Sequence, residues 1–155
     1  QATRLFAFEA FLPREKKERA AILEELKNET RTIILYEAPH HLRQTLEELY
    51  QTLGNREVTV CKELTKRYEN AAKTTLEDVL AYYKENEPRG EYVLVVAGKS
   101  KEALVEEQRQ EWEKLTLEEH MAHYENGGMD RKEAMKQVAK DRGISKRDVY
   151  RALLE

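Results

Sequence analysis

The sequence predicts an α/β domain with a mainly parallel or mixed sheet and flanking helices, followed by a small helical tail. Short apolar, β-branched runs alternate with amphipathic helical stretches over about residues 3–98. No further strand-like run occurs after Gly98. Three capped helical segments close the chain instead, and the glycine turn between the second and the third is typical of a helix-turn-helix.

Local signals assign the elements of the α/β part in order. Pro13 and Pro39 stand at the favoured first position of two helices, and Gly54 ends the second of them. A threonine cap at Thr74 or Thr75 begins a third helix. Residues 62–73 have no clear period, and we expect a functional loop with an extended edge segment there. Strands are expected at residues 4–8, 32–36, 57–61 and 92–97.

The chain changes character after Gly98. Residues 99–115 are dense in charge and are expected to form a solvated helix or a linker. Thr116, Asp130 and Ser145 then have the pattern of helix N-caps, and Gly143 ends the second of three short helices. The sequence therefore predicts three parts: an α/β domain at 1–98, a charged helix or linker at 99–115, and a helix-turn-helix-like extension at 116–155.

Composition excludes several classes of protein. The chain has 155 residues, of which 27 are basic and 30 acidic, and 40% are hydrophobic, as in one globular domain with a small appendage. No apolar run approaches the roughly 18 residues that a membrane span needs. A single cysteine, Cys61, excludes an internal disulfide and a Cys-rich metal site, and we expect a reducing, cytoplasmic location. The net charge of −3 confines any contact with nucleic acid to a local patch.

Polar residues follow the expected strands, where ligands of open α/β sheets gather. Glu37 comes directly after an apolar run and before a helix N-terminus, so it either contacts a ligand or caps that helix. His40 and His41 at the same helix start suit contacts with phosphate or ribose, or lie on the surface. His120 and His123 have no third ligand in sight, so no metal site is expected.

A mixed cluster of charges follows the third expected strand. Lys62, Lys66 and Arg67 stand with Glu63 and Glu69, a mixture that suits a phosphate backbone or a solvated face. We keep both interpretations.

The tail is locally basic. Eight basic residues stand against three acidic ones between residues 131 and 151. This excess suits contacts with phosphate, and it is equally compatible with exposed helix faces around an apolar core. Neither a Walker loop nor a dinucleotide-binding loop occurs in the chain.

Several ordered motifs resemble one known family. They are Phe11-Leu12-Pro13 before a basic helix, Tyr36-Glu37-Ala38-Pro39-His40, Glu63-Leu64-Thr65-Lys66 with Tyr68-Glu69, and Gly90-Glu91-Tyr92 leading to Gly98. In this order they closely resemble the C-terminal part of the ribosomal RNA small subunit methyltransferase I family, within the tetrapyrrole methylase superfamily. The resemblance covers essentially the whole chain, including the helical tail.

The resemblance implies a two-domain α/β fold that binds S-adenosylmethionine in the cleft between the domains. It implies methyl transfer to the ribose 2′-OH of a cytidine in small-subunit rRNA, with no metal. The chain starts at Gln1 without an initiator Met, as an excised second domain does, so an N-terminal domain of the same polypeptide is expected to complete the cleft. The implied partners are that domain and small-subunit rRNA or the 30S subunit, with a homodimer left open and no membrane.

The resemblance also assigns sides of the cleft to individual residues, without identifying the catalytic base. The cofactor side is expected to comprise Tyr36, Glu37, Ala38, Glu63, Leu64, Thr65 and Gly98. The substrate side is expected to comprise Leu12, Pro13, His40, His41, Lys62, Lys66 and Arg67, with Lys146, Arg147 and Arg151 from the tail.

The chain departs from the family at several positions. Ala10 stands where the family usually has Gly, and His41 and Lys62 stand where it has Arg, whose planar fork suits phosphate and base edges. Residues 70–74 also replace a more acidic and aromatic segment. Two other functions stay open, a non-catalytic nucleic-acid-binding adaptor and a methylase of a tetrapyrrole small molecule. Cofactor binding would separate the first from the methyltransferase, and the basic tail argues against the second.

Overall fold

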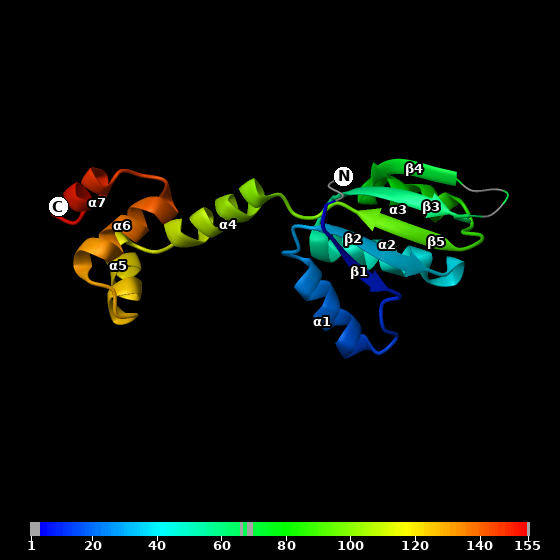
Figure 1. Cartoon of the computed structure of the whole chain (residues 1–155), viewed down its shortest axis with the longest axis horizontal. Coiled ribbons are helices and arrows are strands. Elements are labelled where there is room, and N and C mark those ends of the chain that lie inside the picture. Colours follow the sequence, from blue (N-terminus) through cyan, green and yellow to red (C-terminus); the bar gives the residue numbers. More distant parts are fainter. Residues whose placement is uncertain (1–3, 66, 68–69, 155) are drawn as a thin grey trace. The chain divides into compact units, whose positions relative to one another are not determined.

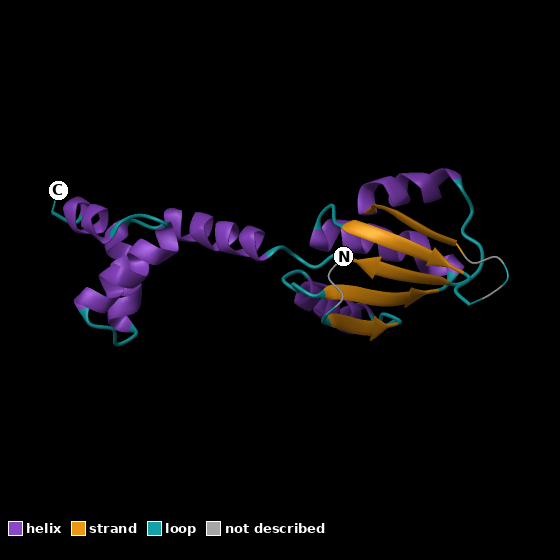
Figure 2. Cartoon of the chain, turned by 45° about the horizontal axis from the view of Figure 1, so that its top comes forward, coloured by secondary structure: helices purple, strands orange, loops and turns teal. Residues whose placement is uncertain are grey.

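The computed structural model describes residues 4–65, 67 and 70–154, in two compact units (Figures 1 and 2). The first unit ends at Ser100 and the second begins at Lys101. The structure shows no described helix long and apolar enough to cross a membrane.

A five-stranded sheet forms the centre of the first unit. Its strands are β1 (Phe6–Ala10), β2 (Thr32–Glu37), β3 (Glu57–Lys62), β4 (Asn70–Thr75) and β5 (Tyr92–Val96), in the order β1-β2-β5-β3-β4. β1 is parallel to β2, whereas the pairs β2/β5, β5/β3 and β3/β4 are antiparallel. The prediction of a mixed sheet is confirmed and that of a mainly parallel one is wrong, because β5 inserts in the opposite direction between β2 and β3.

Three helices pack on the sheet: α1 (Lys16–Leu26), α2 (Pro39–Leu53) and α3 (Leu76–Glu85). In α2 the leucines that repeat every three or four residues are fully buried, and they meet alternate residues of the central strands. The expected ends of α2 and α3 are confirmed, because Gly54 ends α2 at a φ of 79° and the Thr75 hydroxyl accepts a hydrogen bond from the Asp78 N–H. The expected start of α1 at Pro13 is wrong, because its N-cap is Glu15. Burial of this apolar interface fixes the sheet and helices as one body.

β1 and β2 carry aromatic side chains that are exposed to solvent. Phe6 and Phe8 are more than half exposed, and Tyr36 is 40% exposed. The Tyr36 ring meets Phe8 and Phe11 edge to face, with centroids 5.2 and 5.7 Å apart. Because strand side chains alternate between faces, Tyr36 lies on the face opposite to its neighbours Leu35 and Glu37, which are buried.

The second unit contains α4 (Lys101–Glu113), α5 (Leu117–Asn126), α6 (Arg131–Arg142) and α7 (Lys146–Ala152). Thr116 and Glu119 form the expected capping box, and Asp130 and Ser145 cap α6 and α7 with their side chains. The turn between α6 and α7 begins at Gly143, whose φ of 64° suits glycine. The core of this unit comprises Met121, Ala134, Met135, Val138, Ala139 and Val149.

Candidate active-site edge of the sheet

The carboxyl ends of β1, β2 and β3 lie at one edge of the sheet. β2 and β3 both run antiparallel to β5, so they share one direction, and Tyr92 at the start of β5 is the register partner of both Glu37 and Lys62. The loops at residues 11–15, 38–41, 63–65 and 89–91 therefore meet there, and we call this region the carboxyl edge. Gly98 follows β5 and lies at the opposite edge, where its Cα is so close to the Thr30 carbonyl that an added Cβ would be 2.3 Å from that oxygen.

Gly98 is therefore not grouped with the other expected cofactor residues, because it lies at the other end of the sheet. The resemblance places Gly98 beside Glu37 and Glu63, but the antiparallel direction of β5 sends its end away from both. The start of β5, with Gly90 and Glu91, takes its place at the carboxyl edge.

The backbone of the carboxyl edge is strained at three residues. Ala10, Glu63 and Thr65 are the described non-glycine residues with positive φ, at 49°, 53° and 65°. A positive φ costs an L-residue about 1 to 2 kcal/mol, and such strain concentrates at functional sites. Ala10 lies at a register shift in the β1/β2 pairing, between Phe8 and Ala10.

Glu63 fixes the loop after β3 to the start of β5. Its Oε1 accepts a hydrogen bond from the Glu91 N–H at 2.7 Å, and its own N–H donates to the Glu91 carbonyl at 3.0 Å. Gly90, at a φ of 81°, leaves room for this carboxylate, because a Cβ there would lie 2.2 Å from Oε1. The side chain of Glu63 therefore shapes the edge, beside the partly buried Leu64 and the exposed Thr65.

Glu37 is buried and hydrogen-bonded within the protein. One carboxylate oxygen accepts from the Ala38 N–H at 2.8 Å, and the other accepts from the Thr45 hydroxyl at 2.5 Å. Arg19 of α1 donates to the same hydroxyl at 2.7 Å and to Glu48 at 2.5 Å. Glu37 does not cap α2, which has no side-chain cap; its network joins β2, α1 and α2, and its contact with a ligand stays a prediction.

A pocket of about 470 Å³ opens beside this network at the carboxyl edge. Ala38, the N-cap of α2, has no side chain that caps the helix, so the amino end of α2 faces the pocket with a favourable dipole for anions. The lining comprises Phe11, Leu12, Arg14, Arg19, Glu37, Ala38, His41 and Gln44. The arrangement can accept an anionic group beside the Phe11 ring and the Arg14 guanidinium, whereas Arg19 is already bound to Glu48 and Thr45.

The other predicted residues of this region are only partly brought together. His41 lines the pocket, whereas His40 is exposed with its ring centroid 4.2 Å from that of His41. Leu12 is 6% exposed and belongs to the core as much as to the pocket. The Pro13 carbonyl accepts a hydrogen bond from Arg19, and Tyr36 faces the aromatic side of the sheet.

The residues after β3 are described in part. Lys62 lines a different pocket, and Arg67 is exposed. Lys66 and Glu69 lie outside the described residues. Lys146, Arg147 and Arg151 are exposed on α7, in the second unit.

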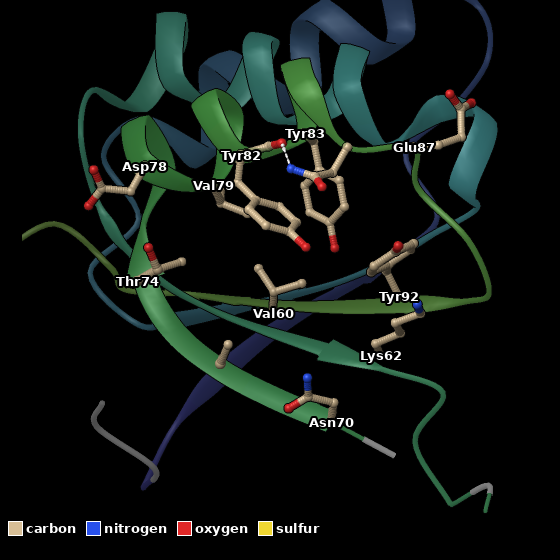
Figure 3. Close-up of a pocket in the computed structure, with 12 residues that line it drawn as sticks. Val60, Lys62, Asn70, Thr74, Asp78, Val79, Tyr82, Tyr83, Glu87 and Tyr92 are labelled. Carbon is tan, nitrogen blue, oxygen red and sulfur yellow. Dashed lines mark hydrogen bonds between the residues drawn. The ribbon is translucent and has the colours of Figure 1, made fainter. Parts of the chain in front are cut away.

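A second pocket, of about 460 Å³, lies between α3 and the strands β3, β4 and β5 (Figure 3). Tyr82 and Tyr83 point from α3 toward Val60, and Lys62 and Asn70 lie at the end of the pocket near Tyr92 (Figure 3). The Tyr92 hydroxyl accepts from the Arg89 N–H at 3.0 Å. Burial and a hydrogen bond with Tyr92 raise the pKa of the Tyr83 phenol, so it stays protonated at neutral pH.

Sequence reasoning missed this tyrosine-lined pocket. Tyr83 carries the helical spacing of a core residue, and nothing in the spacing shows that β4 would leave a hollow beneath α3. Arg14 and Arg19 were also missed, since they belong to a charged run that resembles a solvated helix face. Among the described residues, no group of three or more His, Cys, Asp or Glu side chains could hold a metal ion.

Comparison with known proteins adds a family. The sequence profile of the family described as tetrapyrrole (corrin/porphyrin) methylases matches residues 1–80. A Bacillus subtilis protein named ribosomal RNA small subunit methyltransferase I is 47% identical over 147 residues, which are 95% of this chain and 50% of that protein. A Synechocystis protein of the same name is 39% identical over 155 residues, covering 99% of this chain and 54% of its own length. The chain thus spans about half the length of the curated relatives it matches.

One solved structure is also similar. It is described as a cobalamin biosynthetic enzyme, the cobalt precorrin-4 methyltransferase CbiF. It is 19% identical with a TM-score of 0.46, over 61% of this chain and 41% of that one.

Proposed function

Because the chain belongs to the family of tetrapyrrole (corrin/porphyrin) methylases, we propose that it is part of an S-adenosylmethionine-dependent methyltransferase that methylates a cytidine ribose 2′-OH of small-subunit rRNA. The observation that carries the proposal is the 47% identity to a protein named for this rRNA activity over 95% of the chain. The match is long enough to include much of the helical unit as well as the sheet. The tetrapyrrole small molecule is therefore not the favoured substrate.

The carboxyl edge offers one wall of a cofactor site. It has an open pocket with an aromatic ring, a helix start without a side-chain cap, and three residues at positive φ. This mixture fits S-adenosylmethionine, which has an aromatic base, a polar ribose and a charged amino-acid end. Tyr36-Glu37-Ala38 and Glu63-Leu64-Thr65 are the segments that we assign to it, chiefly through their backbone. Gly98 is left out because it lies at the opposite edge.

When bound, S-adenosylmethionine supplies a methyl group on a sulfonium ion. What this chain contributes is position, because an in-line displacement needs the attacking oxygen aligned with the carbon–sulfur bond. Glu37 and Glu63 shape the edge through hydrogen bonds to backbone and hydroxyl groups, so we assign neither as the catalytic base. The base is expected elsewhere in the cleft, which an N-terminal domain of the same polypeptide completes.

The RNA side is proposed from charge. Arg14, His40, His41, Lys62 and Arg67 lie at or next to the carboxyl edge and suit phosphate contacts. The predicted Lys66 belongs to the same stretch, and α7 adds further cations. A protein with this substrate works where rRNA is, in the cytoplasm.

The experiment is methyl transfer from radiolabelled S-adenosylmethionine to small ribosomal subunits. We compare this chain alone with this chain joined to the N-terminal half that completes its relatives. A ribose 2′-O-methyl group blocks alkaline cleavage, so label in an alkali-resistant dinucleotide, with the joined protein only, supports the proposal. No label in RNA from a folded, cofactor-binding joined protein would contradict it.

A further inference from the structure

The last helix, α7, presents an exposed tyrosine among cations. Tyr150 is 55% exposed. Lys146 and Arg147 precede it by four and three residues, which places them beside it on the helix surface, and Arg151 lies one turn after Arg147. The four side chains therefore form one exposed face, which we call the α7 face.

The positive charge of the α7 face is offset only in part by Asp148, whose pKa is also lowered by the charges of Arg147 and Arg151. Within the part of the chain that the structure describes, none of its three cations has an ion-pair partner within 4 Å. Asp148, the acidic residue of this helix, is used by the cap: its carboxylate accepts from the Ser145 hydroxyl at 2.5 Å. That hydrogen bond lowers the pKa of Asp148, so the cap and its charge persist at neutral pH.

Packing holds Tyr150 outward. The neighbouring Val149 is fully buried in the core of the second unit, and Leu153 packs against the same core. Upstream, the Ile144 N–H donates to the Ala139 carbonyl at 3.0 Å and fixes the turn after α6. A rotation of α7 that buried Tyr150 would expose Val149, so the aromatic ring stays on the surface.

Charge is also segregated within this unit. Residues 101–126 carry eight acidic and three basic side chains, whereas residues 131–151 carry eight basic and three acidic ones. On α6, Lys132, Lys136 and Lys140 follow one another every four residues in an exposed stripe. Most basic side chains of residues 131–151 thus lie on two consecutive helices, and a surface of one sign attracts polyanions.

An aromatic ring between arginines suits one kind of polyanion in particular. Exposed aromatic side chains stack on unpaired bases, and adjacent Arg and Lys side chains hold the flanking phosphates. Bases within a duplex are already stacked on each other and are not available. We propose that the α7 face binds single-stranded or loop RNA, with Tyr150 stacked on an unpaired base and Arg147 and Arg151 on its phosphates; this rests on the proposed function, which supplies the RNA.

The test is equilibrium binding of the full chain to a short unstructured RNA and to a duplex of the same sequence. Tyr150→Ala is expected to weaken single-strand binding about 5- to 150-fold, the loss typical of one stacked base, and to leave duplex binding unchanged. Tyr150→Phe keeps the ring and is expected to bind like the native chain. The matched control is Tyr82→Ala, which removes a tyrosine of 58% exposure from α3 in the first unit.

The role of the arginines is tested by salt. Arg147→Gln is expected to weaken both RNAs and to flatten the dependence of log affinity on log salt by about 0.7 to 0.9, because one phosphate contact is lost. An unchanged slope overturns the assignment of Arg147.

Three results would overturn the inference. The first is that the native and Tyr150→Ala chains bind single-stranded RNA equally well. The second is that Tyr150→Ala loses as much affinity for the duplex as for the single strand. The third is that an acidic peptide displaces the bound RNA as well as unlabelled RNA does. Methyl transfer by the joined protein separates this failure from that of the proposed function. Label transfer without a Tyr150 effect leaves the function standing, whereas a Tyr150 effect without label transfer leaves only the RNA-binding face.

Discussion

Ala10 shows how a single residue can depart from what its backbone demands. Its φ of 49° at the register shift of β1 favours glycine, and the family that the sequence resembles usually has Gly at this position. We predict that Ala10→Gly raises the free energy of unfolding by about 0.5 to 1 kcal/mol. Glycine relieves the strain of the folded state, and the larger entropy of the unfolded chain offsets part of this gain. Urea denaturation measures it. Ala71→Gly, in the exposed strand β4, is the control and should lower stability instead.

Thr45 tests the buried network around Glu37. Its hydroxyl donates to Glu37 and accepts from Arg19, so Thr45→Val leaves a buried carboxylate oxygen and a guanidinium N–H without their partner. We predict a loss of about 1 to 3 kcal/mol in the free energy of unfolding. Thr52→Val, on the same helix without such a network, should change it by less than about 0.5 kcal/mol. Equal effects of the two substitutions would mean that the network contributes nothing special.

For individual residues, the sequence limited the possible roles to a few alternatives but did not decide between them. Glu37 was expected either at a ligand or at the helix start, and only the positions of Thr45 and Arg19 decide where its two oxygens go. Arg19 approaches from another helix, and local spacing cannot show such a contact. The strain at Glu63 and Thr65 was equally invisible, because neither residue type signals positive φ.

Elements were predicted better than their arrangement. Helix starts at Pro39, Thr116, Asp130 and Ser145 follow from capping chemistry, which acts within four residues and can be read locally. The direction of β5 depends on the connection that carries the chain back across the sheet, and the hydrophobic periodicity of the sequence does not show strand direction. β4 was expected only as an extended segment, because four of its six residues are exposed and show no alternation.

The packing of α4, α5 and α6 gives the second unit a pH dependence. His120 is fully buried, stacked on Trp112 at 4.0 Å, and its Nδ1 accepts from Arg142 Nε at 3.1 Å. Burial first, and then the Arg142 charge, lower the pKa of His120 against the opposing pull of Asp141. The unfolded chain therefore binds this proton more tightly, and stability present above pH 6.5 is lost as the pH falls below it.

Fluorescence of Trp112, the only tryptophan, reports this unit alone. We predict that the urea midpoint of the Trp112 signal falls as the pH is lowered from about 7.5 to about 5.5. The corresponding free energy of unfolding falls by at most about 1.4 kcal/mol per pH unit. His120→Gln should remove that dependence, and His123→Gln, on the same helix, should keep it. A midpoint of the native chain that does not move with pH would contradict the assignment.

At the scale of the whole molecule, the two units divide the proposed work. The sheet supplies a strained, hydrogen-bonded edge at which a cofactor and a ribose can be aligned, and the helical unit supplies a separate cationic face. The chain spans about half the length of its relatives, and the proposed function takes the other wall of the cleft from an N-terminal domain. The fold class could be predicted from alternating periods, whereas the position of the edge could not, because it depends on the direction of β5.

The most direct test of the account is hydrogen–deuterium exchange of the joined protein with and without S-adenosylmethionine. We predict slower exchange on binding in the loops at residues 11–15, 38–41, 63–65 and 89–91, which meet at the carboxyl edge, and no change at 98–100, beyond the opposite edge. Protection confined to residues 98–100, with the loops of the carboxyl edge unchanged, would contradict the central claim that this edge is the cofactor wall.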